Sequence, residues 1–297
     1  MSYSYPFTVF TPTYNRAHTL HRVHESLLEQ TFTDFEWLIV DDGSSDDTRD
    51  LVASWQAPFP IRYIYKDNGG KHTAFNRGVQ EAKGELFLTF DSDDSCVPEA
   101  LQTFYEVWQG IEDKENFAGV TALCMDETGN IVGDKFATDV CDATYLEGKY
   151  IYKNKGEKWG LQRTDVLKEF PYPEPQGIKL IYEGYVWARI SQKYQTRYVN
   201  KCLRVYYTEA GSYMNAAPAK YASDLAYSTK EVLNYELAYF WKAPLTFIKQ
   251  TVHYVRFSLH AHAALFKGLK PTLGRVLVSL CLPLGALVFV KDRLQYR

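Results

Sequence analysis

Short apolar runs alternate with stretches of helical spacing through the first ninety residues of the chain. Leu20, Val23 and Leu27 recur every three or four residues, which is typical of a helix with one buried face. We expect strands at residues 7–10, 35–40, 61–65 and 85–90, and helices at residues 17–30, 46–55 and 71–83. Strands and helices that alternate in this order form a mostly parallel sheet with right-handed connections.

The pattern becomes mixed beyond Pro98. We expect a hairpin turn at residues 126–130, a strand at 158–162, helices at 164–169 and 185–193, and two short strands between 196 and 207. In the earlier helix at 71–83, the small residues Ala74, Gly78 and Ala82 form a face that could pack closely on a sheet. The pattern predicts one α/β domain, residues 1–215, and a helical extension, residues 216–297.

Charge is distributed unevenly along the chain, whose net charge is −3. Residues 242–297 hold nine Lys and Arg and one acid, Asp292, so this stretch carries +8 and the remainder −11. Within it, the run at 276–290 is uncharged. As a helix this run would reach only about 22 Å, short of the roughly 30 Å hydrocarbon core of a bilayer, so we expect it to lie in the plane of an anionic membrane surface. The alternative is an amphipathic helix buried against the body or against a partner subunit of a homo-oligomer.

Composition places further limits on the class of protein. Hydrophobic residues make up 46% of the chain, which excludes a disordered protein. Five cysteines occur singly, without a Cys-x-x-Cys pair, and the first residues lack both a basic start and an apolar stretch. These features are typical of reduced thiols and of a chain without a signal peptide. We therefore expect a cytoplasmic protein that is peripheral on the inner face of the cell membrane.

Two aspartate clusters follow predicted strands. Asp41 and Asp42 end the second strand, and Asp91, Asp93 and Asp94 follow the fourth. The carboxyl ends of parallel strands meet at one edge of a sheet, where such sheets bind ligands. Because carboxylates in one crevice repel one another, we expect a divalent cation there, with an oxygen-rich ligand such as a diphosphate. The alternative is that these residues only form turns and cap helices.

The segment after the first predicted strand, residues 11–16, contains no glycine. Phosphate loops of the Rossmann and Walker types need glycines so that the backbone can approach phosphate. A sugar nucleotidyltransferase, the other enzyme class with this kind of sheet, would need a Gly-rich basic loop here. Tyr14 could instead stack on a base while Asp42 accepts the N3–H of a uracil ring.

Several motifs taken together carry a resemblance to a known family. They are Thr11-Pro12-Thr13-Tyr14-Asn15-Arg16, Asp42-Gly43-Ser44, Asn68-x-Gly70, Ala74-x-Asn76-x-Gly78, Ala82-x-Gly84-Glu85 and Asp91-Ser92-Asp93-Asp94. This combination resembles the family 2 glycosyltransferases with the GT-A fold, closely over residues 7–94 and more weakly to about Tyr207. The resemblance implies a mostly parallel, Rossmann-like nucleotide-binding sheet with a mixed acceptor-side half.

The same resemblance implies an activity and its residues. It implies a metal-dependent inverting transfer of a single sugar, preferably from a UDP-sugar, to a glycan or lipid-linked acceptor in surface polysaccharide or glycolipid synthesis. It implies that Asp93 binds Mn²⁺ or Mg²⁺ directly, with Asp91 beside the ion. The residues implied for the nucleotide-sugar are Thr11, Tyr14, Asp42, Lys71, Asp91 and Ser92.

The acceptor side of the resemblance departs from the family pattern. Relatives commonly carry Glu-Asp before a helix, with the Asp as the base, whereas here Glu183 is followed by Gly184. Glu183 is therefore the carboxylate left to take the acceptor proton, or else it only stabilises the start of its own helix. Trp159 and Trp187 could stack on an acceptor sugar or belong to the core.

Other departures bear on the donor and on the class of enzyme. The Arg that often precedes Asn76 in relatives is Phe75, so a pyrophosphate contact could have moved to Lys71 or Arg77. No Gln-x-x-Arg-Trp motif occurs, which argues against a processive synthase. Because of Gly184, a non-catalytic glycan- or nucleotide-binding protein on the same scaffold is the alternative function. We expect no nucleic-acid partner.

Overall fold

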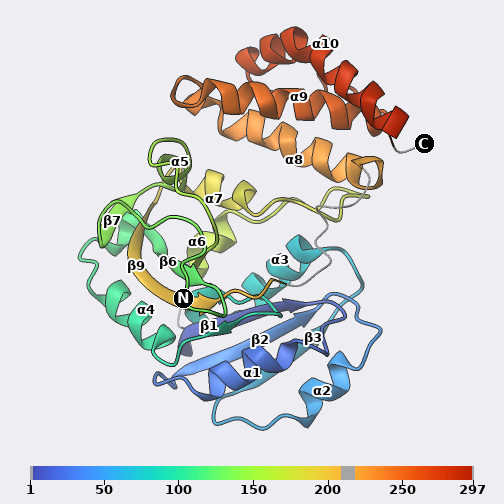
Figure 1. Cartoon of the computed structure of the whole chain (residues 1–297). Coiled ribbons are helices and arrows are strands. Elements are labelled where there is room, and N and C mark those ends of the chain that lie inside the picture. Colours follow the sequence, from blue (N-terminus) through green and yellow to red (C-terminus); the bar gives the residue numbers. More distant parts are fainter. Residues whose placement is uncertain (1–2, 209–217, 296–297) are drawn as a thin grey trace. The chain divides into compact units, whose positions relative to one another are not determined.

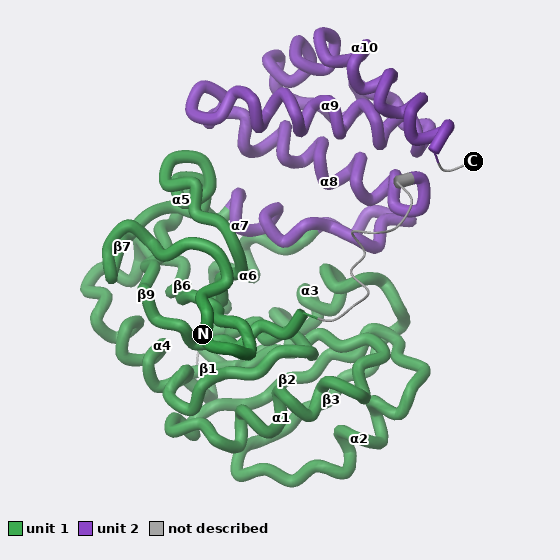
Figure 2. The backbone as a smooth tube through the Cα atoms, in the orientation of Figure 1, with its two compact units in different colours: residues 1–172, 190–208 green, residues 173–189, 209–297 purple. Residues whose placement is uncertain are grey.

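The computed structural model describes residues 3–208 and 218–295 of the chain. It contains two compact units (Figures 1 and 2). Unit 1 comprises Met1–Tyr172 and Ile190–Thr208, and unit 2 comprises Pro173–Arg189 and Glu209–Arg297. The predicted boundary between residues 215 and 216 lies outside the described residues.

Unit 1 begins with a regular alternation of strands and helices. The elements are β1 (Tyr5–Thr13), α1 (Leu20–Leu28), β2 (Phe35–Asp41), α2 (Thr48–Ser54), β3 (Ile61–Tyr65), α3 (Lys71–Glu81) and β4 (Gly84–Thr89). These four strands pair in parallel in the order β3-β2-β1-β4. The parallel sheet predicted from the sequence is confirmed: the runs at β1, β2 and β4 form neighbouring strands, and the half-buried β3 pairs at the edge beside β2.

The second half of unit 1 extends the same sheet with strands of both directions. Its elements are β5 (Ser95–Cys96), α4 (Ala100–Gln109), a 3₁₀ turn (Lys114–Asn116), β6 (Phe117–Met125), β7 (Val140–Ala143), α5 (Tyr145–Tyr150), β8 (Lys158–Arg163), α6 (Thr164–Glu169) and β9 (Gln195–Val205). β8 joins the sheet antiparallel to both β4 and β6, and β9 runs parallel to β6. The sheet is therefore mixed in this half, as predicted.

One strand differs from its prediction. The region expected to hold two short strands between 196 and 207 forms the single strand β9. Its pairing with β6 jumps from Val199 to Cys202, so two residues bulge out between them. The bulge is stabilised by Asn200, whose amide side chain bonds to both the backbone N–H and the carbonyl of Phe136. The bulge breaks the apolar alternation, which is why the sequence resembles two strands. The predicted hairpin turn at 126–130 is confirmed by an antiparallel bridge between Met125 and Ile131.

Unit 2 is helical. It holds α7 (Gly184–Ile190) up to Arg189, a 3₁₀ turn (Pro218–Tyr221), α8 (Ala222–Tyr235), a second 3₁₀ turn (Leu237–Lys242), α9 (Pro244–His260) and α10 (Thr272–Gln295). The segment before α7 is tied to these helices, since the backbone N–H of Lys179 donates to Asp224 at 3.1 Å and the Tyr182 hydroxyl donates to Glu236.

The last helix is longer than the apolar run within it. α10 has 24 residues, which corresponds to about 36 Å, and it is long and apolar enough to cross a membrane by length and composition. The prediction that the apolar segment is too short to span is therefore wrong, because the helix continues through charged residues at both ends.

Close contact between α3 and the sheet positions the edge where the aspartates lie. Gly78 of α3 faces Phe10 of β1, and a Cβ placed at residue 78 would lie 2.3 Å from the Phe10 ring. The small-residue face of this helix thus allows the close packing that the sequence predicts.

We predict that Gly78→Ala lowers the free energy of unfolding by about 1–3 kcal/mol, because overpacking outweighs the better helix propensity of Ala. Urea denaturation of both variants measures the change. Gly148→Ala in α5 is the matched control, since a Cβ there would have ordinary contacts of 3.7 Å or more. Equal or higher stability of the Gly78→Ala variant would contradict the packing argument.

Candidate functional site

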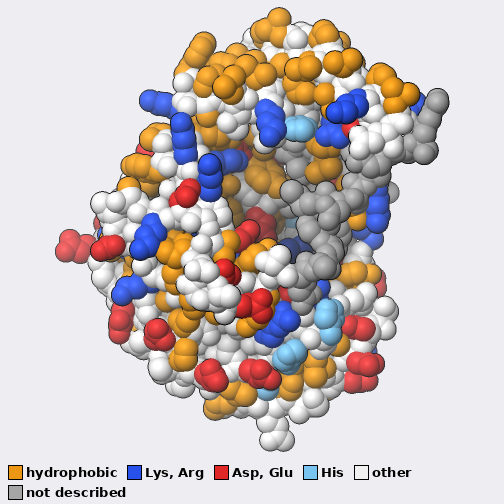
Figure 3. Space-filling model, viewed as in Figure 1, with side chains coloured by type: hydrophobic (Ala, Val, Ile, Leu, Met, Phe, Trp, Pro, Cys, Tyr) orange, Lys and Arg blue, Asp and Glu red, His pale blue; other side chains and the backbone are white. Residues whose placement is uncertain are grey.

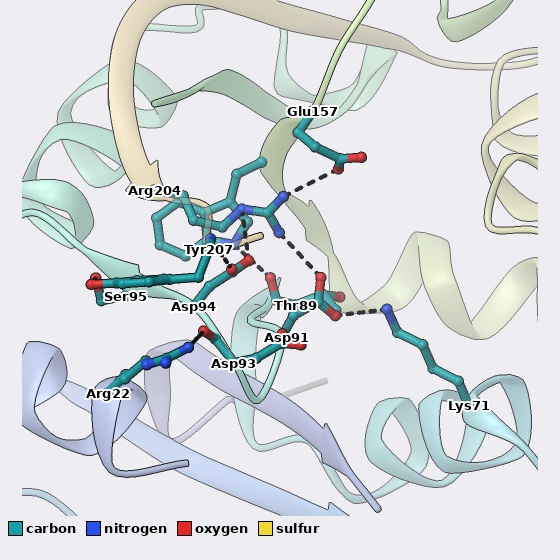
Figure 4. Close-up of polar contacts among 11 residues, drawn as sticks. Arg22, Lys71, Thr89, Asp91, Asp93, Asp94, Ser95, Glu157, Arg204 and Tyr207 are labelled. Atoms are coloured by element: carbon teal, nitrogen blue, oxygen red, sulfur yellow. Dashed lines mark hydrogen bonds and ion pairs between the residues drawn. The ribbon is translucent and has the colours of Figure 1, made fainter. Parts of the chain in front are cut away.

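The second aspartate cluster lies in the turn between β4 and β5 (Figure 4). Two residues at the start of unit 1 bond to the backbone of this turn. The Thr19 hydroxyl donates to the carbonyl of Ser92 at 3.0 Å, and Arg22 donates to the carbonyl of Asp93 at 2.9 Å. The turn is therefore anchored to α1 through main-chain contacts, which leave the carboxylates of the cluster to other partners.

Arg204 on β9 contacts the carboxylates from the other side (Figure 4). Its Nη1 lies 3.2 Å from Asp91, its Nη2 lies 3.3 Å from Glu157, and its Nε lies 3.4 Å from Asp94. The side chain is only 5% exposed. β5 pairs with β9 so that Cys96 stands opposite Arg204, and this pairing brings the guanidinium to the turn.

The three aspartates of this turn have different electrostatic environments. Burial would raise the pKa of Asp91, but Lys71, whose Nζ lies 2.6 Å away, and Arg204 hold it well below the usual range. Burial, assisted by the neighbouring Asp91, raises the pKa of Asp93. Burial also raises the pKa of Asp94, to about 7, against the opposing effect of Arg204. The turn thus holds three carboxylates with different pKa values beside three cations, Lys71, Arg204 and Arg16, whose Nη2 lies 3.4 Å from Asp93.

Asp94 has an incompletely satisfied carboxylate. One oxygen accepts from the backbone N–H of Tyr207 at 3.2 Å. Its other oxygen is buried and has no hydrogen-bond partner among the described residues, although the Arg204 Nε lies 3.4 Å away. A buried acceptor without a donor is costly, so protonation of Asp94 or a bound cation nearby would relieve this site.

The first aspartate cluster organises a loop. Asp42 is 4% exposed, and its carboxylate accepts from Lys66 at 2.6 Å, from Asn68 at 3.2 Å, and from the backbone N–H groups of Gly69 and Gly70 at 2.9 and 2.7 Å. These four donors fill the acceptor sites of the carboxylate. A base N–H would have to replace one of them to reach Asp42.

This loop connects the two clusters. Gly70 has φ +98°, a conformation that favours glycine, and α3 begins at the next residue, Lys71. Asp42 therefore fixes the backbone immediately before Lys71, whose ammonium group pairs with Asp91. Arg77 pairs instead with Glu81 on its own helix, so Lys71 is the cation that α3 brings to the aspartates.

The remaining residues predicted for the donor have different surroundings. Tyr14 is 46% exposed just beyond β1, as a stacking residue must be. Thr11 is fully buried, and its hydroxyl accepts from the Trp37 indole at 3.0 Å, so its side chain belongs to the core. Asp41 is also buried, and its carboxylate accepts from the Tyr63 hydroxyl and from the backbone N–H of Ser44, so it stabilises the end of β2.

The residues predicted for the acceptor side divide between the units. Trp159 is 3% exposed, packs against Phe90 and Phe104, and donates to the carbonyl of Thr89 at 2.6 Å. Of the two alternatives for Trp159, stacking on an acceptor sugar or a place in the core, its burial favours the core. Trp187 is half-buried in α7, and the exposed Glu183 immediately precedes that helix in unit 2.

In unit 1, the carboxylates that could bind a metal ion are those of Asp91 and Asp93. Among residues 3–208 and 218–295, no three His, Cys, Asp or Glu side chains are grouped so that they could hold a metal by themselves. Mg²⁺ is commonly held by one or two carboxylates together with phosphate oxygens, and Asp93, whose side chain is 29% exposed, fits that arrangement.

Sequence reasoning missed Arg204 and Glu157. The signal available for Arg204 was a single charge within the apolar stretch Cys202–Tyr207, where a buried cation requires an acidic partner. No local signal identified which acids these would be. Arg16 belongs to the motif at residues 11–16, but the sequence predicted no role for it. In the structure its Nη2 lies 3.4 Å from Asp93.

Comparison with known proteins agrees with this geometry. The family model described as Glycosyl transferase family 2 matches residues 8–165. An uncharacterized glycosyltransferase of Nostoc sp. is 42% identical over 104 residues, which cover 34% of this chain and 32% of the relative. A Campylobacter jejuni protein named GalNAc(5)-diNAcBac-PP-undecaprenol β-1,3-glucosyltransferase is 26% identical over 67% of this chain and 63% of its own length.

A solved structure has a similar fold. Crystalline S. aureus TarS 1–349, in complex with UDP-GlcNAc, matches with a TM-score of 0.62 at 20% identity, over 96% of this chain and 80% of that one. The expected GT-A fold, a mostly parallel sheet with a mixed half and a C-terminal helical part, is thereby confirmed. The family match covers more than half of the chain, and so this chain belongs to glycosyl transferase family 2 and is a glycosyltransferase.

Proposed function

We propose that the chain is a metal-dependent inverting glycosyltransferase that moves one sugar from a UDP-sugar to a glycan or lipid-linked acceptor. The observation that carries this proposal is the turn Asp91–Asp94, whose three carboxylates and the nearby Glu157 crowd around three cations, Arg16, Lys71 and Arg204. Such a site is suited to a divalent cation that arrives with a nucleoside diphosphate. The UDP-GlcNAc complex of the similar TarS fold supports a uridine donor.

In this proposal the nucleotide lies along the carboxyl edge of β1, β2 and β4. The exposed Tyr14 offers a ring for the base, and Asp42 holds the loop in front of Lys71. Asp42 can accept a hydrogen bond from the N3–H of uracil only if Asn68 or Lys66 stops donating to its carboxylate. Of the contacts that these two residues make with the carboxylate, that of Asn68 is the longer, at 3.2 Å. Asp91 and Ser92 lie where the ribose would follow, and Thr11 acts through its backbone, since its side chain is in the core.

The reaction requires that charge on the departing diphosphate be neutralised. A Mn²⁺ or Mg²⁺ ion held by Asp93, with Asp91 beside it, would supply that neutralisation when bound. Lys71 is 2.6 Å from Asp91 and 44% exposed, so it can turn toward a phosphate while remaining in the site. We assign Arg204 a positioning part, because it is buried and holds Asp91, Asp94 and Glu157 in one arrangement.

Inversion requires a base on the acceptor side. The acceptor hydroxyl loses its proton to a carboxylate as its oxygen attacks the anomeric carbon and the bond to the diphosphate breaks. We propose Glu183 for this step, because it is exposed and stands at the start of α7, where Gly184 follows. Trp187, half-buried in the same helix, is the aromatic residue proposed for the acceptor.

The acceptor class points to a membrane. The Campylobacter relative bears a name that specifies an undecaprenol-linked acceptor. By analogy, we propose that this chain adds a sugar to a lipid-linked glycan in surface polysaccharide or glycolipid synthesis. The enzyme would then work in the cytoplasm, on the inner face of the cell membrane.

Ligand binding raises apparent stability by mass action, so the donor can be identified by thermal shift. We predict that UDP and a UDP-sugar raise the melting temperature in the presence of Mn²⁺, and that GDP and dTDP at equal concentration raise it less. The experiment compares the three nucleotides with and without Mn²⁺. A larger shift with GDP would contradict the uridine preference, and shifts that are equal in EDTA would contradict the metal requirement.

We predict that Asp93→Asn abolishes the Mn²⁺-dependent part of the UDP shift and lowers transfer by about 100-fold or more, since an active-site cation contributes several kcal/mol. The fold should be retained, because the pKa of Asp93 is already raised by burial and by Asp91, so removing its charge relieves repulsion. Asp50→Asn, an exposed acid of α2, is the matched control. Unchanged Mn²⁺ dependence in Asp93→Asn would refute the metal assignment.

We predict that Glu183→Gln lowers the rate of transfer by about 100-fold or more while UDP binding is unchanged, because only the step that needs a proton acceptor is lost. Initial rates with a radiolabelled UDP-sugar and calorimetric UDP titration separate the two effects. Glu127→Gln, at an exposed turn, controls for loss of a surface charge. Near-normal turnover would assign the base elsewhere, to Glu174 first and then to Glu209, which lies outside the described residues.

A further inference from the structure

One face of α10 is apolar and exposed. The side chains that form it are Val276, Leu280, Leu284, Leu287, Val290 and Leu294, which are 48–73% exposed. At about 100° per residue they fall within roughly 120° of the helix circumference, so they form one continuous stripe. We call these six residues the α10 stripe. Figure 3 shows hydrophobic side chains gathered over the helices of unit 2 on the face in view.

The opposite face of α10 is packed on its neighbours. Gly285 lies so close to α9 that a Cβ there would be 2.5 Å from Val255. Further along, Asp292 accepts from Arg256 through both carboxylate oxygens, at 2.5 and 2.6 Å, and lies 3.0 Å from His260. α9 and α10 therefore pack against each other along the second half of α10.

In the C-terminal helices, residues 218–295, the acidic side chains are buried and most of the basic ones are exposed. All four carboxylates between residues 218 and 295, those of Asp224, Glu231, Glu236 and Asp292, are at most 8% exposed. Most Lys and Arg side chains of the same part are exposed, including those of Arg275 and Arg293 at the two ends of α10. These two arginines are eighteen residues apart, and so they flank the stripe on the same side. The accessible charge around the stripe is thus positive.

We propose that the α10 stripe embeds in the surface of an anionic lipid bilayer with the helix lying in the membrane plane. An apolar face flanked by Lys and Arg is the arrangement that binds in this way. The partner is a bilayer with acidic headgroups, because positive charge alone flanks the stripe. This inference needs no donor or acceptor chemistry and is independent of the proposed reaction.

Packing against α9 argues against a transmembrane orientation, which the length of α10 would permit. If α10 crossed the bilayer, α9 would enter with it and would bring Lys249, His253 and Arg256 to hydrocarbon depth. Charged side chains are costly there. In the plane of the membrane, the same helix pair keeps these groups at the headgroups while the stripe reaches the acyl chains.

Flotation with liposomes tests the attachment. The full chain should float with vesicles of phosphatidylglycerol and phosphatidylethanolamine, less so at high salt, and weakly with pure phosphatidylcholine. The double variant Leu280→Glu/Leu287→Glu should lose at least about 10-fold in bound fraction, since each change places a charge where acyl chains lie. The matched control is Val140→Glu/Ile151→Glu, which adds the same charge at two exposed apolar positions of unit 1.

The outcomes separate the explanations. Equal loss in both double variants would mean that net charge alone decides binding, and it would overturn the proposal. A second outcome would also overturn the proposal. In it, the wild-type chain does not bind vesicles, and light scattering shows a wild-type dimer that the Leu280→Glu/Leu287→Glu variant no longer forms. The α10 stripe would then bind a second copy of the chain. The UDP shift with Mn²⁺ should be the same in all variants, so failure of the attachment and failure of the proposed reaction remain distinguishable.

Depth measurements test the orientation. Single cysteines at residues 276, 284 and 290, in a Cys141→Ser/Cys202→Ser background, carry an environment-sensitive dye, and nitroxide lipids quench the dye from shallow or deep positions. The other three cysteines are buried. All three sites should be quenched most strongly by the shallow nitroxide. Deepest quenching at residue 284 with shallow quenching at both ends would indicate a spanning helix and would overturn the in-plane orientation.

Discussion

Crowding of carboxylates at the carboxyl edge of the sheet is the constraint on which the site depends. Asp91, Asp93 and Asp94 occupy one short turn, and charges of like sign at such spacing are stable only beside cations. Arg204 supplies one cation from β9 and Lys71 another from α3. Removing one partner of a buried ion pair costs about 3–5 kcal/mol, so the pairing of β5 with β9, which brings the buried Arg204 to this turn, stabilises it. The packing of α3 on β1 positions Lys71, whose pair with Asp91 is more exposed.

The first aspartate cluster acts on the second through the backbone. Asp42 accepts the N–H groups of Gly69 and Gly70 and thereby fixes the start of α3, where Lys71 reaches Asp91. A ligand that drew a donor away from Asp42 would loosen the same loop. The carboxylates that follow β2 and β4 are thus physically connected through Gly70 and Lys71.

Unit 2 has a different physical character from the sheet. Between residues 218 and 295 its carboxylates are buried and most of its cations are exposed, while α10 carries large apolar side chains on its open face. Asp292 illustrates the arrangement, because its contacts with Arg256 and His260 remove the last acid of the chain from the surface. An apolar face flanked by basic side chains, on an enzyme of this family, is consistent with an acceptor that is itself anchored in a lipid bilayer.

The sequence by itself determined the parallel half of the sheet and the aspartates at its strand ends, because apolar periodicity and strand-end position are local properties. It also identified Lys71 as a candidate cation. Arg204 could not be assigned, since 113 residues separate it from Asp91 and only strand pairing joins them. Whether Trp159 faces a ligand or the core was likewise decided by packing, because an aromatic residue in a strand suits either environment. The charge excess of the last residues could be counted from the sequence, but burial of Asp292 and exposure of the stripe depend on which face of α10 meets α9, and only the tertiary structure decides that.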